Sequence, residues 1–515
     1  MSKSKTQSRV NRMNAARMVR HVREAQRAYY DAAAASRLTD KLFSHATAGE
    51  IDTFINADWA TVCARALYEL RMNGYARGWM FSLADHIVGS GPTLQMLTDD
   101  DKFNTEIEDR ISDWFSVADR GGRMDFGALL RLGVYQWMGC GDMLQQFVTD
   151  ETADDDVTPV KLRIQPIHPV RLNTPWTGLP PGSSVRYGVE VDSAGKALAY
   201  YIQKRDARQP YTLWDDYDKI PARYVAHLFV AEEAGQTRAM PWLTPSLPLL
   251  AQLRRYSKAT LTAAESAAEM NIILSASDKL IELLADLDED FTFDVPDSME
   301  DLGLAPGGMI ATPPGYVASQ MKSEQPSTQY PAAKKEFLSE GARPLGLPYN
   351  RASGSSEGYN YSSGRLDMQE AQPFIENKQT WLANAFCNRV LRLWLREAHL
   401  IPGFLSHPRP DLVFRPGRGV PCQWYWPGIK HVDPQKEAAG RDINLRNATD
   451  TLADAWSREG ADWKRKMEQR CLEAKAAAEF EKRYGVKLSW PWDPSSTARS
   501  TASAENPGPA TEENA

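Results

Sequence analysis

At 515 residues the chain is too long for a single hydrophobic core, and roughly two to four domains are expected. Its 60 Lys and Arg residues against 67 Asp and Glu residues give a net charge of −7, which argues against a protein that grips nucleic acid over its whole surface. The five cysteines are widely spaced and form no C-x-x-C pair, so neither a disulfide framework nor a cysteine zinc site is expected, and a reducing cytoplasm fits. No apolar run approaches the roughly 20 residues that span a bilayer.

The first 30 residues carry eight basic side chains and a single acidic one, Glu24. Such a segment suits contact with DNA or an acidic partner, and it also imitates a transit peptide. A solvated basic arm is the simpler interpretation. At the other end, residues 495–515 consist largely of Ser, Thr, Ala, Glu and Pro, and this composition predicts disorder.

The first third of the chain has helical patterning. Apolar spacing predicts helices over 58–88, around 107–115 and over 126–137. The first of these ends at Val88-Gly89-Ser90-Gly91-Pro92, a strong stop signal.

A β-rich part follows. Val160, Leu162 and Ile164 alternate with polar residues, as in a half-buried strand. A strand over 185–191, the turn 192–195 and a returning strand over 198–202 together predict a hairpin, and 224–230 predicts a further strand.

After Thr244-Pro245 the spacing of apolar residues becomes that of a helix. A capping hydroxyl followed by Pro is also typical of a helix start. The stripe that follows persists to Ala268. Residues 272–326 are irregular and rich in Gly and Pro, and helical patterning returns over 327–343.

A second long helix is predicted over 363–399. Leu382, Phe386, Val390 and Leu393 mark one of its faces, and Pro373 should kink it or mark its true start. In the last helical region one stripe is shared by Trp463, Met467, Cys471 and Ala474.

Between these helical regions lies a polar segment, 346–365, rich in Ser, Gly, Asn and Tyr. Loops longer than roughly 12–15 residues are uncommon in compact domains and usually serve function or are disordered. The segment contains Gly354-Ser355-Ser356-Glu357-Gly358, a formal match to the hydrolase pattern G-x-S-x-G. A nucleophile elbow needs a buried strand before the serine and a helix directly after it. Neither is indicated here, so Ser356 is not expected to be a nucleophile.

Other chemical motifs give no site. No G-x-x-x-x-G-K-[ST] phosphate loop occurs, and the eight histidines form no H-x-H or H-x-x-x-H pair. Asp286, Asp288, Glu289 and Asp290 suggest a two-metal nuclease, but no strand framework is predicted to hold them together. A solvated charged face is the better interpretation, and we expect no catalytic residue, metal or cofactor.

Five groups of residues occur in an order that suggests a family. They are Arg71-Met72-Asn73 with Val88-Gly89-Ser90-Gly91; Gly235-Gln236-Thr237-Arg238 with Pro241; Tyr349 with Asn360-Tyr361-Ser362-Ser363 and Arg365; Trp426-Pro427-Gly428 with Val432-Asp433-Pro434; and Gly460-Ala461-Asp462-Trp463. Together they resemble the portal proteins of tailed bacteriophages, in the family typified by phage lambda. The chain departs from that pattern at Gly74, where Asn is usual, at Asp142, where Glu is usual, and at Ala239, where Gly is usual. Pro373 also lies in a helix that the family runs through.

The resemblance implies an α+β portal fold, with a mostly helical wing, stem and crown, β-hairpins in the wing and a small α/β clip. It divides the chain into a basic N-terminal arm (1–29), a wing (30–243), a first stem helix (244–271), a clip (272–326), a second stem helix (327–345), a tunnel loop (346–362), a long wing helix (363–400), the wing edge and crown (401–485) and a disordered tail (486–515).

The resemblance also implies a function without catalysis. About twelve copies would form a ring at one capsid vertex, through which double-stranded DNA is packaged and ejected. The implied partners are the large terminase, the major capsid or scaffolding protein and a head-completion or tail connector protein, with no membrane. The protein would be assembled in the host bacterial cytoplasm and become part of the virion. Two alternatives are a minor head or scaffolding protein and a serine hydrolase or metal nuclease.

In that frame the polar segment would line the narrow part of the channel. The residues expected there are Asn350, Arg351, Ser353, Ser355, Ser356 and Asn360, with Lys334 and Lys335 as local attractive groups for phosphates. The acidic chain suits a conduit, because a strongly basic bore would retain phosphates. The two stem helices would bury their apolar stripes fully only against neighbouring subunits.

Overall fold

The computed structural model describes residues 48–152, 157–175, 179, 184–204, 216–268, 272–276, 316–320, 329–415, 419–428, 434–457, 459 and 463–486. The chain divides into two compact units, Met1–Phe54 and Ile55–Ala515. The described part of the first unit holds only the start of helix α3, and all that follows concerns the second unit. The predicted basic arm, the acidic cluster 286–290 and residues 487–515 of the predicted tail lie outside the described residues.

The predicted helix over 58–88 is two helices, α3 (Ile51–Met72) and α4 (Gly74–Ile87). The expectation of one continuous helix is wrong because Asn73 interrupts it. Asn73 has extended backbone angles, and its side-chain oxygen accepts a hydrogen bond from the Tyr75 N–H at 3.0 Å. Asn is among the preferred N-cap residues, so a local cap here overrides the apolar periodicity that runs across it.

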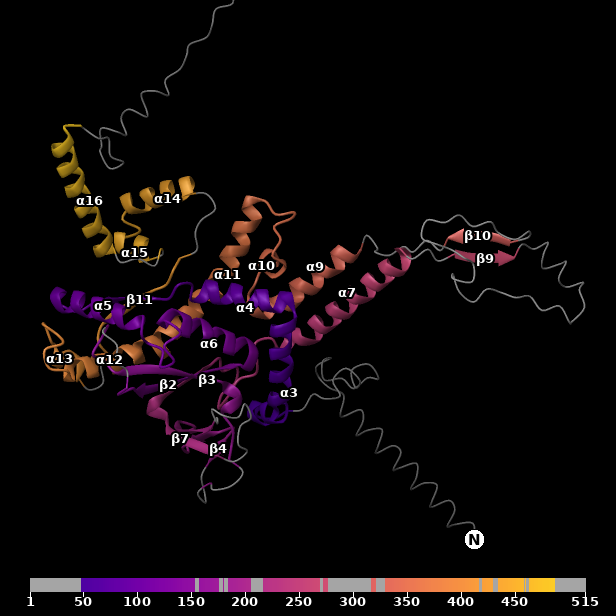
Figure 1. Cartoon of the computed structure of the whole chain (residues 1–515), viewed down its shortest axis with the longest axis horizontal. Helices are drawn as coiled ribbons and strands as arrows, with labels where there is room; N and C mark the ends of the chain where they lie inside the picture. The colour runs from indigo at the N-terminus through magenta and orange to yellow at the C-terminus, as the bar shows by residue number, and fades with distance from the viewer. Residues whose placement is uncertain are drawn as a thin grey trace, which may run out of the picture. The chain divides into compact units, whose positions relative to one another are not determined.

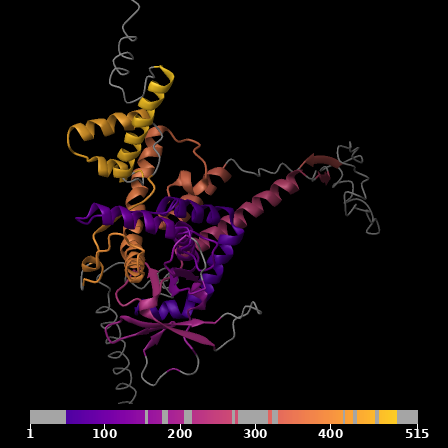
Figure 2. The ribbon, with the colours of Figure 1, turned by 60° about the vertical axis from the view of Figure 1, so that its left-hand side comes forward.

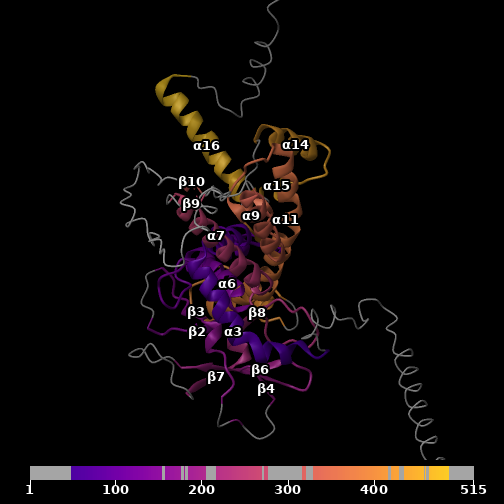
Figure 3. The same cartoon turned by 90° about the vertical axis from the view of Figure 1, so that its right-hand side faces the viewer.

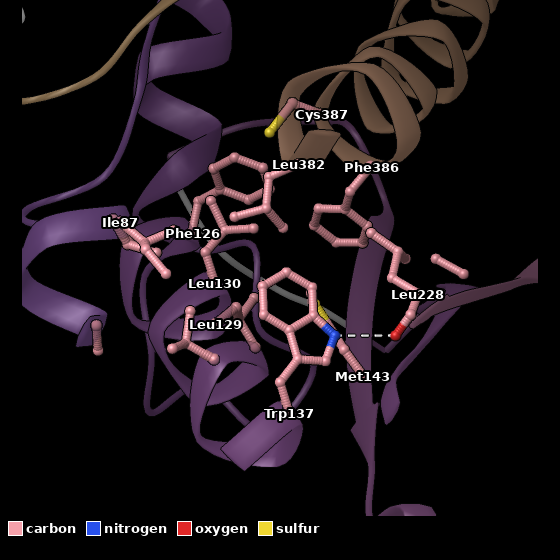
Figure 4. Packing of buried hydrophobic residues seen from close by; sticks show 14 of the residues in the cluster. Ile87, Phe126, Leu129, Leu130, Trp137, Met143, Leu228, Leu382, Phe386 and Cys387 are labelled. Atoms are coloured by element: carbon pink, nitrogen blue, oxygen red, sulfur yellow. Dashed lines mark hydrogen bonds between the residues drawn. The ribbon is translucent and has the colours of Figure 1, made fainter. Parts of the chain in front are cut away.

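The other two helices of this region are confirmed as α5 (Asp101–Phe115) and α6 (Phe126–Cys140). Helix α6 ends at Gly141, whose φ of 84° lies in the left-handed region that favours glycine. The hydrophobic core is built around α6. Figure 4 shows the Trp137 indole N–H donating to the Leu228 carbonyl at 2.9 Å, and the side chains around it are Ile87, Phe126, Leu129, Leu130, Met143, Leu382, Phe386 and Cys387.

Two antiparallel sheets form the β-rich part. In the first, β2 (Asp142–Thr149) lies between β3 (Leu162–Ile167) and β8 (Val225–Phe229). The second has the order β4–β5–β6–β7, with β4 at Val185–Arg186, β5 at Val189–Val191, β6 at Ala197–Gln203 and β7 at Tyr217–Pro221. Short 3-10 turns at Pro169–Arg171 and Ala222–Tyr224 connect the strands. The predicted strands near 160–165 and 224–230 are confirmed, and so is the hairpin closed by 192–195.

The predicted single strand over 185–191 is instead a tight hairpin of β4 (Val185–Arg186) and β5 (Val189–Val191). Tyr187 and Gly188 have φ values of 53° and 82°. Positive φ at both central residues is the requirement of a type I′ turn, whose twist matches that of paired strands. The alternating apolar pattern concealed this turn because Tyr187 occupies an apolar position in it.

The helix start at Thr244-Pro245 is confirmed as a 3-10 turn (Thr244–Ser246) that continues into α7 (Leu247–Ala268). Helix α7 leads to the strand β9 (Ile272–Ala276), which pairs antiparallel with β10 (Tyr316–Gln320) and is followed by α9 (Tyr330–Ala342). Figures 1 and 2 show α7 as one long, uninterrupted helix. α7 and α9 are joined by a hydrogen bond from the Tyr330 hydroxyl to Ser257 Oγ at 3.1 Å.

The predicted long helix over 363–399 is three consecutive segments. They are α11 (Tyr361–Leu382), a π-helical turn (Ala383–Cys387) and α12 (Asn388–Leu400). Pro373 lies inside α11 and does not mark its start, which is at Tyr361. The predicted inward face is confirmed for Leu382, Phe386 and Val390, all fully buried.

The remaining elements lie after residue 400. They are α13 (Pro410–Val413), β11 (Cys422–Tyr425), which pairs with β1 (Thr93–Met96), and then α14 (Pro434–Arg446), α15 (Leu452–Ser457) and α16 (Trp463–Tyr484). On the predicted α16 stripe, Met467, Cys471 and Ala474 are exposed. The described sheets are all antiparallel, and the two larger ones come from the single stretch 142–229, which fits the α+β class that the model as a whole shows. Among the described helices, none combines the length and the apolarity needed to cross a bilayer.

Candidate functional site

The predicted loop 346–362 is not structureless. It begins with Gly346, which ends the 3-10 turn Arg343–Leu345, and it contains the short helix α10 (Tyr349–Ser353). Within the predicted loop, residues 346–348 and residues 354–360 lack regular structure, and the second stretch is called the exposed loop here. Sequence reasoning missed α10 because five residues are too few to show a helical period.

Buried contacts fix the base of the exposed loop. The Trp79 indole N–H of α4 donates to the Ala352 carbonyl at 2.8 Å, and both residues are almost completely buried. On the adjoining helix α9, a side chain at Gly341 would meet the Trp79 ring at 3.1 Å. The Ser246 hydroxyl donates to the Gly341 carbonyl at 2.6 Å. Helix α10 is therefore held against α4, and α9 is tied to the start of α7. Figure 3 shows α9 beside α7.

A second anchor lies on the other side of the segment. Gly346 has a φ of 64°, and a Cβ there would lie 2.9 Å from the Phe374 ring of α11. Only glycine combines this backbone conformation with so close a ring. On α11 itself, the Gln379 amide donates to the carbonyls of His86 and Ile87 at 3.2 Å each, which joins α11 to the end of α4.

The serines near the tip bond to their own backbone. The Ser353 hydroxyl donates to the Tyr349 carbonyl at 2.8 Å and accepts from the Ser355 N–H at 3.2 Å. Ser355 Oγ accepts from the Glu357 N–H at 3.2 Å. Ser356 is exposed, and its carbonyl accepts from the Tyr359 N–H at 3.1 Å. The residues before Ser356 form a helix and not a buried strand, so the backbone setting of a nucleophile elbow is absent here.

Asn360 ends the exposed loop as the N-cap of α11. Its side-chain oxygen accepts from the Ser363 N–H at 2.8 Å, while Ser363 Oγ accepts from the Asn360 N–H at 3.0 Å. This reciprocal pair is a capping box, which satisfies two backbone donors at the helix start. Asn360 therefore defines where α11 begins, in addition to being exposed.

The two predicted lysines lie on α9 above tyrosine rings. Lys334 Nζ is 5.2 Å from the Tyr75 ring centroid, and Lys335 Nζ is 5.1 Å from that of Tyr349. A hydrogen bond with the Tyr75 hydroxyl raises the pKa of Lys334 above its ordinary value. Both ammonium groups thus make cation–π contacts within the chain. These contacts keep the two charges close to α9.

Arg351 and Ser353 line a groove of about 560 Å³ next to α10. Its other walls come from the break between α3 and α4 and from α7, with Arg254 and Ser257. Arg254 is paired with Glu69 at 2.8 Å, whereas Arg351 is exposed. Asn350 is half-buried, and its side-chain oxygen is enclosed without a hydrogen-bond partner among the described residues. Burial and the nearby charge of Arg351 both lower the pKa of His86.

The sequence is similar to those of known portal proteins. The family model described as "Phage portal protein, lambda family" matches residues 37–379. The chain belongs to this family. Its role is that of a capsid portal.

Two portal relatives support the assignment over a longer stretch. The "Probable portal protein" of Halomonas phage phiHAP-1 is 24% identical over 446 residues, covering 83% of this chain and 82% of that protein. The "Portal protein" of Escherichia phage N15 is 22% identical over 476 residues, covering 83% and 88%.

Solved structures give weaker matches. The neck of an empty gene transfer agent particle computed with C6 symmetry matches with a TM-score of 0.39 and 13% identity, covering 68% of this chain and 94% of that one. The neck of a native particle computed with C12 symmetry matches with a TM-score of 0.36 and 12% identity, covering 66% and 91%.

In this portal protein the predicted site residues fall into two groups. Arg351 and Ser353 share a groove, and Lys334 and Lys335 lie on the adjoining helix, whereas Ser355, Ser356 and Asn360 belong to the exposed loop. Sequence reasoning missed Trp79 and Tyr75, the α4 partners of α10 and Lys334. Trp79 lies 273 residues from Ala352 along the chain, and no local pattern links the two.

The portal family is structural and not enzymatic. Across the part of the chain that the structure describes, no group of three or more His, Cys, Asp or Glu side chains could hold a metal ion. The predicted nuclease cluster at 286–290 lies outside that part.

Proposed function

We propose that this portal protein forms a ring of about twelve copies at one vertex of the virion capsid, through which viral double-stranded DNA is packaged and ejected. Membership of the lambda portal family supports this proposal. The chain's net charge of −7 also suits a conduit, since a strongly basic bore would retain phosphates.

The exposed loop and α10 provide the surface that faces the moving DNA in this proposal. The observation that supports this assignment is a polar loop next to α10, which is itself fixed by buried contacts with α4. Ser353 and Ser355 bond to their own backbone, and Lys334 and Lys335 lie over tyrosine rings. Few groups are therefore left to bind phosphate strongly, while Arg351 remains exposed. Such a surface guides DNA without holding it in place.

The parts of a portal subunit are assigned on the same basis. Helices α7 and α9 act as the two stem helices, and the β9–β10 pair belongs to the clip between them. The clip would bind the large terminase during packaging and a head-completion or tail connector protein afterwards. The sheets and α3 to α6 belong to the wing, where the major capsid or scaffolding protein would dock. Assembly would take place in the host bacterial cytoplasm.

Deletion of residues 355–358 tests the role of the exposed loop. The deletion leaves Gly354, which caps α10, and Asn360, which caps α11. We expect rings of normal appearance by electron microscopy, because the base of the loop is held by buried contacts that the deletion spares. We also expect packaged or retained DNA to fall at least about tenfold, because the deletion removes the surface proposed to face the DNA.

Ser356→Ala is the matched control, since it changes the exposed hydroxyl and keeps the loop length. It should package DNA at the level of the parent protein. Normal packaging by the deletion variant would contradict the loop assignment. Purified parent protein that stays monomeric at every concentration and salt condition would contradict the ring itself.

A further inference from the structure

Two free thiols lie in contact inside the protein. Cys63 of α3 and Cys140 at the end of α6 have sulfur atoms 3.3 Å apart, and each residue is only 1% exposed. A disulfide bond is about 2.05 Å long, so the two sulfurs need to approach by only about 1.3 Å to form one. Their separation of 77 positions along the chain hid this pair from sequence reasoning.

The surroundings hold both cysteines in place. The Trp59 indole N–H, one turn before Cys63 on α3, donates to the Cys140 carbonyl at 3.1 Å and to the Ala239 carbonyl at 3.2 Å. The Arg238 guanidinium lies 3.9 Å from the Trp59 ring centroid. These residues, Trp59, Cys63, Cys140, Asp142 and Arg238, are called the junction cluster here. It joins α3, the end of α6 and the segment that precedes α7.

The helices also approach closely beside the pair. A Cβ at Gly139 would meet the Leu67 side chain of α3 at 2.8 Å, so a larger residue there would have to displace that side chain. Glycine lets the end of α6 pack closely against α3 beside the two sulfurs. A bond between them would link elements that already pack together.

The two thiols are not equivalent. The hydrogen bond with Cys140 lowers the pKa of Cys63, and the charge of Arg238 acts in the same direction against the effect of burial. The same hydrogen bond, together with burial, raises the pKa of Cys140. Because the thiolate is the reacting form, Cys63 is the member of the pair that reacts first with an electrophilic sulfur, which reaches these buried thiols through local opening of the native state.

We propose that Cys63 and Cys140 are a redox modification site, which forms a disulfide with a small oxidising disulfide such as oxidised glutathione. The Cys63 thiolate attacks one glutathione sulfur, forming a mixed disulfide and releasing one glutathione thiolate. Cys140, on losing its proton, then attacks the Cys63 sulfur and releases the second glutathione. Two protein thiols are oxidised, one glutathione disulfide is reduced, and two reduced glutathione molecules leave with the two protons.

The consequence is a reversible disulfide between α3 and α6 that forms or breaks with the redox environment. Joining positions so far apart in sequence restricts the unfolded chain and stabilises the folded state. A particle that leaves a reducing cytoplasm would carry thiols during assembly and the disulfide afterwards, an order of events that rests on the proposed function. Formation of the bond itself does not depend on that function and is tested separately.

The test uses the purified full-length protein, incubated with oxidised glutathione until the exposed Cys471 has fully reacted. Free thiols are then blocked with N-ethylmaleimide in denaturant, and the digest is mapped by mass spectrometry. We expect a peptide that links Cys63 to Cys140 and disappears on reduction. We also expect the oxidised protein to melt several degrees above the reduced one.

Cys63→Ala and Cys140→Ala should each lose the linked peptide and the rise in Tm on oxidation, whereas Cys471→Ala should keep both. Recovery of Cys63 and Cys140 as maleimide adducts in the parent protein, when Cys471 is fully modified, would overturn the proposal. So would a rise in Tm that persists in the cysteine variants. The peptide map needs only the parent protein, so it decides the question even if a variant does not fold.

Discussion

The junction cluster and the exposed loop use polar groups in opposite ways. In the cluster, the fully buried Asp142 carboxylate accepts from Arg238 Nε at 2.7 Å and from the Ala239 N–H at 3.0 Å, and Arg238 also donates to two backbone carbonyls. In the loop and at the end of α10 that carries it, the hydroxyls of Ser355 and Ser353 bond mainly to nearby backbone. A buried network fixes how elements meet, whereas an exposed loop bonded to itself can present a surface without holding the fold together. Substitutions should therefore affect stability in one region and packaging in the other.

The largest effect on stability is expected from Arg238→Met. It leaves the Asp142 carboxylate buried without its charged partner, and breaking a buried pair from one side costs about 3–5 kcal/mol. Urea denaturation measures this loss as a lower midpoint at constant slope. The control is Arg343→Met, which breaks an Arg343–Glu370 pair exposed at 77% and 64% and should cost no more than about 1 kcal/mol. Equal losses in the two variants would contradict the comparison.

The same variant gives a second readout in acid. Burial alone raises the pKa of Asp142, but Arg238, His227 and the Ala239 N–H outweigh it and hold the pKa below its ordinary value. The folded state therefore binds fewer protons than the unfolded state, and stability is lost as pH falls from about 4 through the folded pKa. Without Arg238 the folded pKa rises toward the unfolded value, so Arg238→Met should lose less stability than the parent protein as the pH falls below about 4.

An intermediate effect is expected from Trp79→Phe. The change removes the donor to the buried Ala352 carbonyl, and an unsatisfied buried group costs about 1–3 kcal/mol. Hydrogen exchange of the amides in α10 should become faster, because α10 loses its link to α4. Tyr484→Phe serves as the control, since that ring is 66% exposed. Unchanged exchange in α10 would mean that Trp79 does not anchor the loop.

The smallest effects are expected within the loop. Asn360→Ala removes the side-chain half of the capping box and should cost about 1 kcal/mol. Ser356→Ala removes an exposed hydroxyl and should stay within about 0.5 kcal/mol of the parent protein. Thermal melts of the two variants check the order. A larger loss for Ser356→Ala would show that its hydroxyl has a partner in the assembled protein.

Local signals in the sequence predicted much of the fold. The Thr244-Pro245 start of α7, the strand near 160–165 and the hairpin turn at 192–195 each depend on residues close together in the chain, and each is found. The errors were also local. A cap at Asn73 and a turn at Tyr187-Gly188 each interrupt an apolar pattern that continues across them, because the preference of the backbone at one or two residues outweighed the period.

The candidate site was only partly predictable. The polar loop could be located from composition and motif, but the helix cap at Asn360, the Trp79 anchor, the groove that Arg351 shares with Arg254 and the Cys63–Cys140 pair could not. Each of the last three joins residues brought together only by packing of distant elements. The family pattern named Asp142 and Arg238 separately, and the structure shows that they are partners.

The π-helical turn at Ala383–Cys387 affects how the loop is oriented. A π turn holds one residue more than the α-helical turn it replaces, so it shifts the angular phase of everything before it relative to α12. Each residue of an α-helix corresponds to a rotation of about 100° about the axis. A single-residue deletion within this turn would therefore rotate α11 about its own axis while Phe386 and Val390 stay in the core. The direction in which the exposed loop points therefore depends on one extra residue in this turn, some 25 residues further along the chain. That residue would not be found by searching for contacts with the loop.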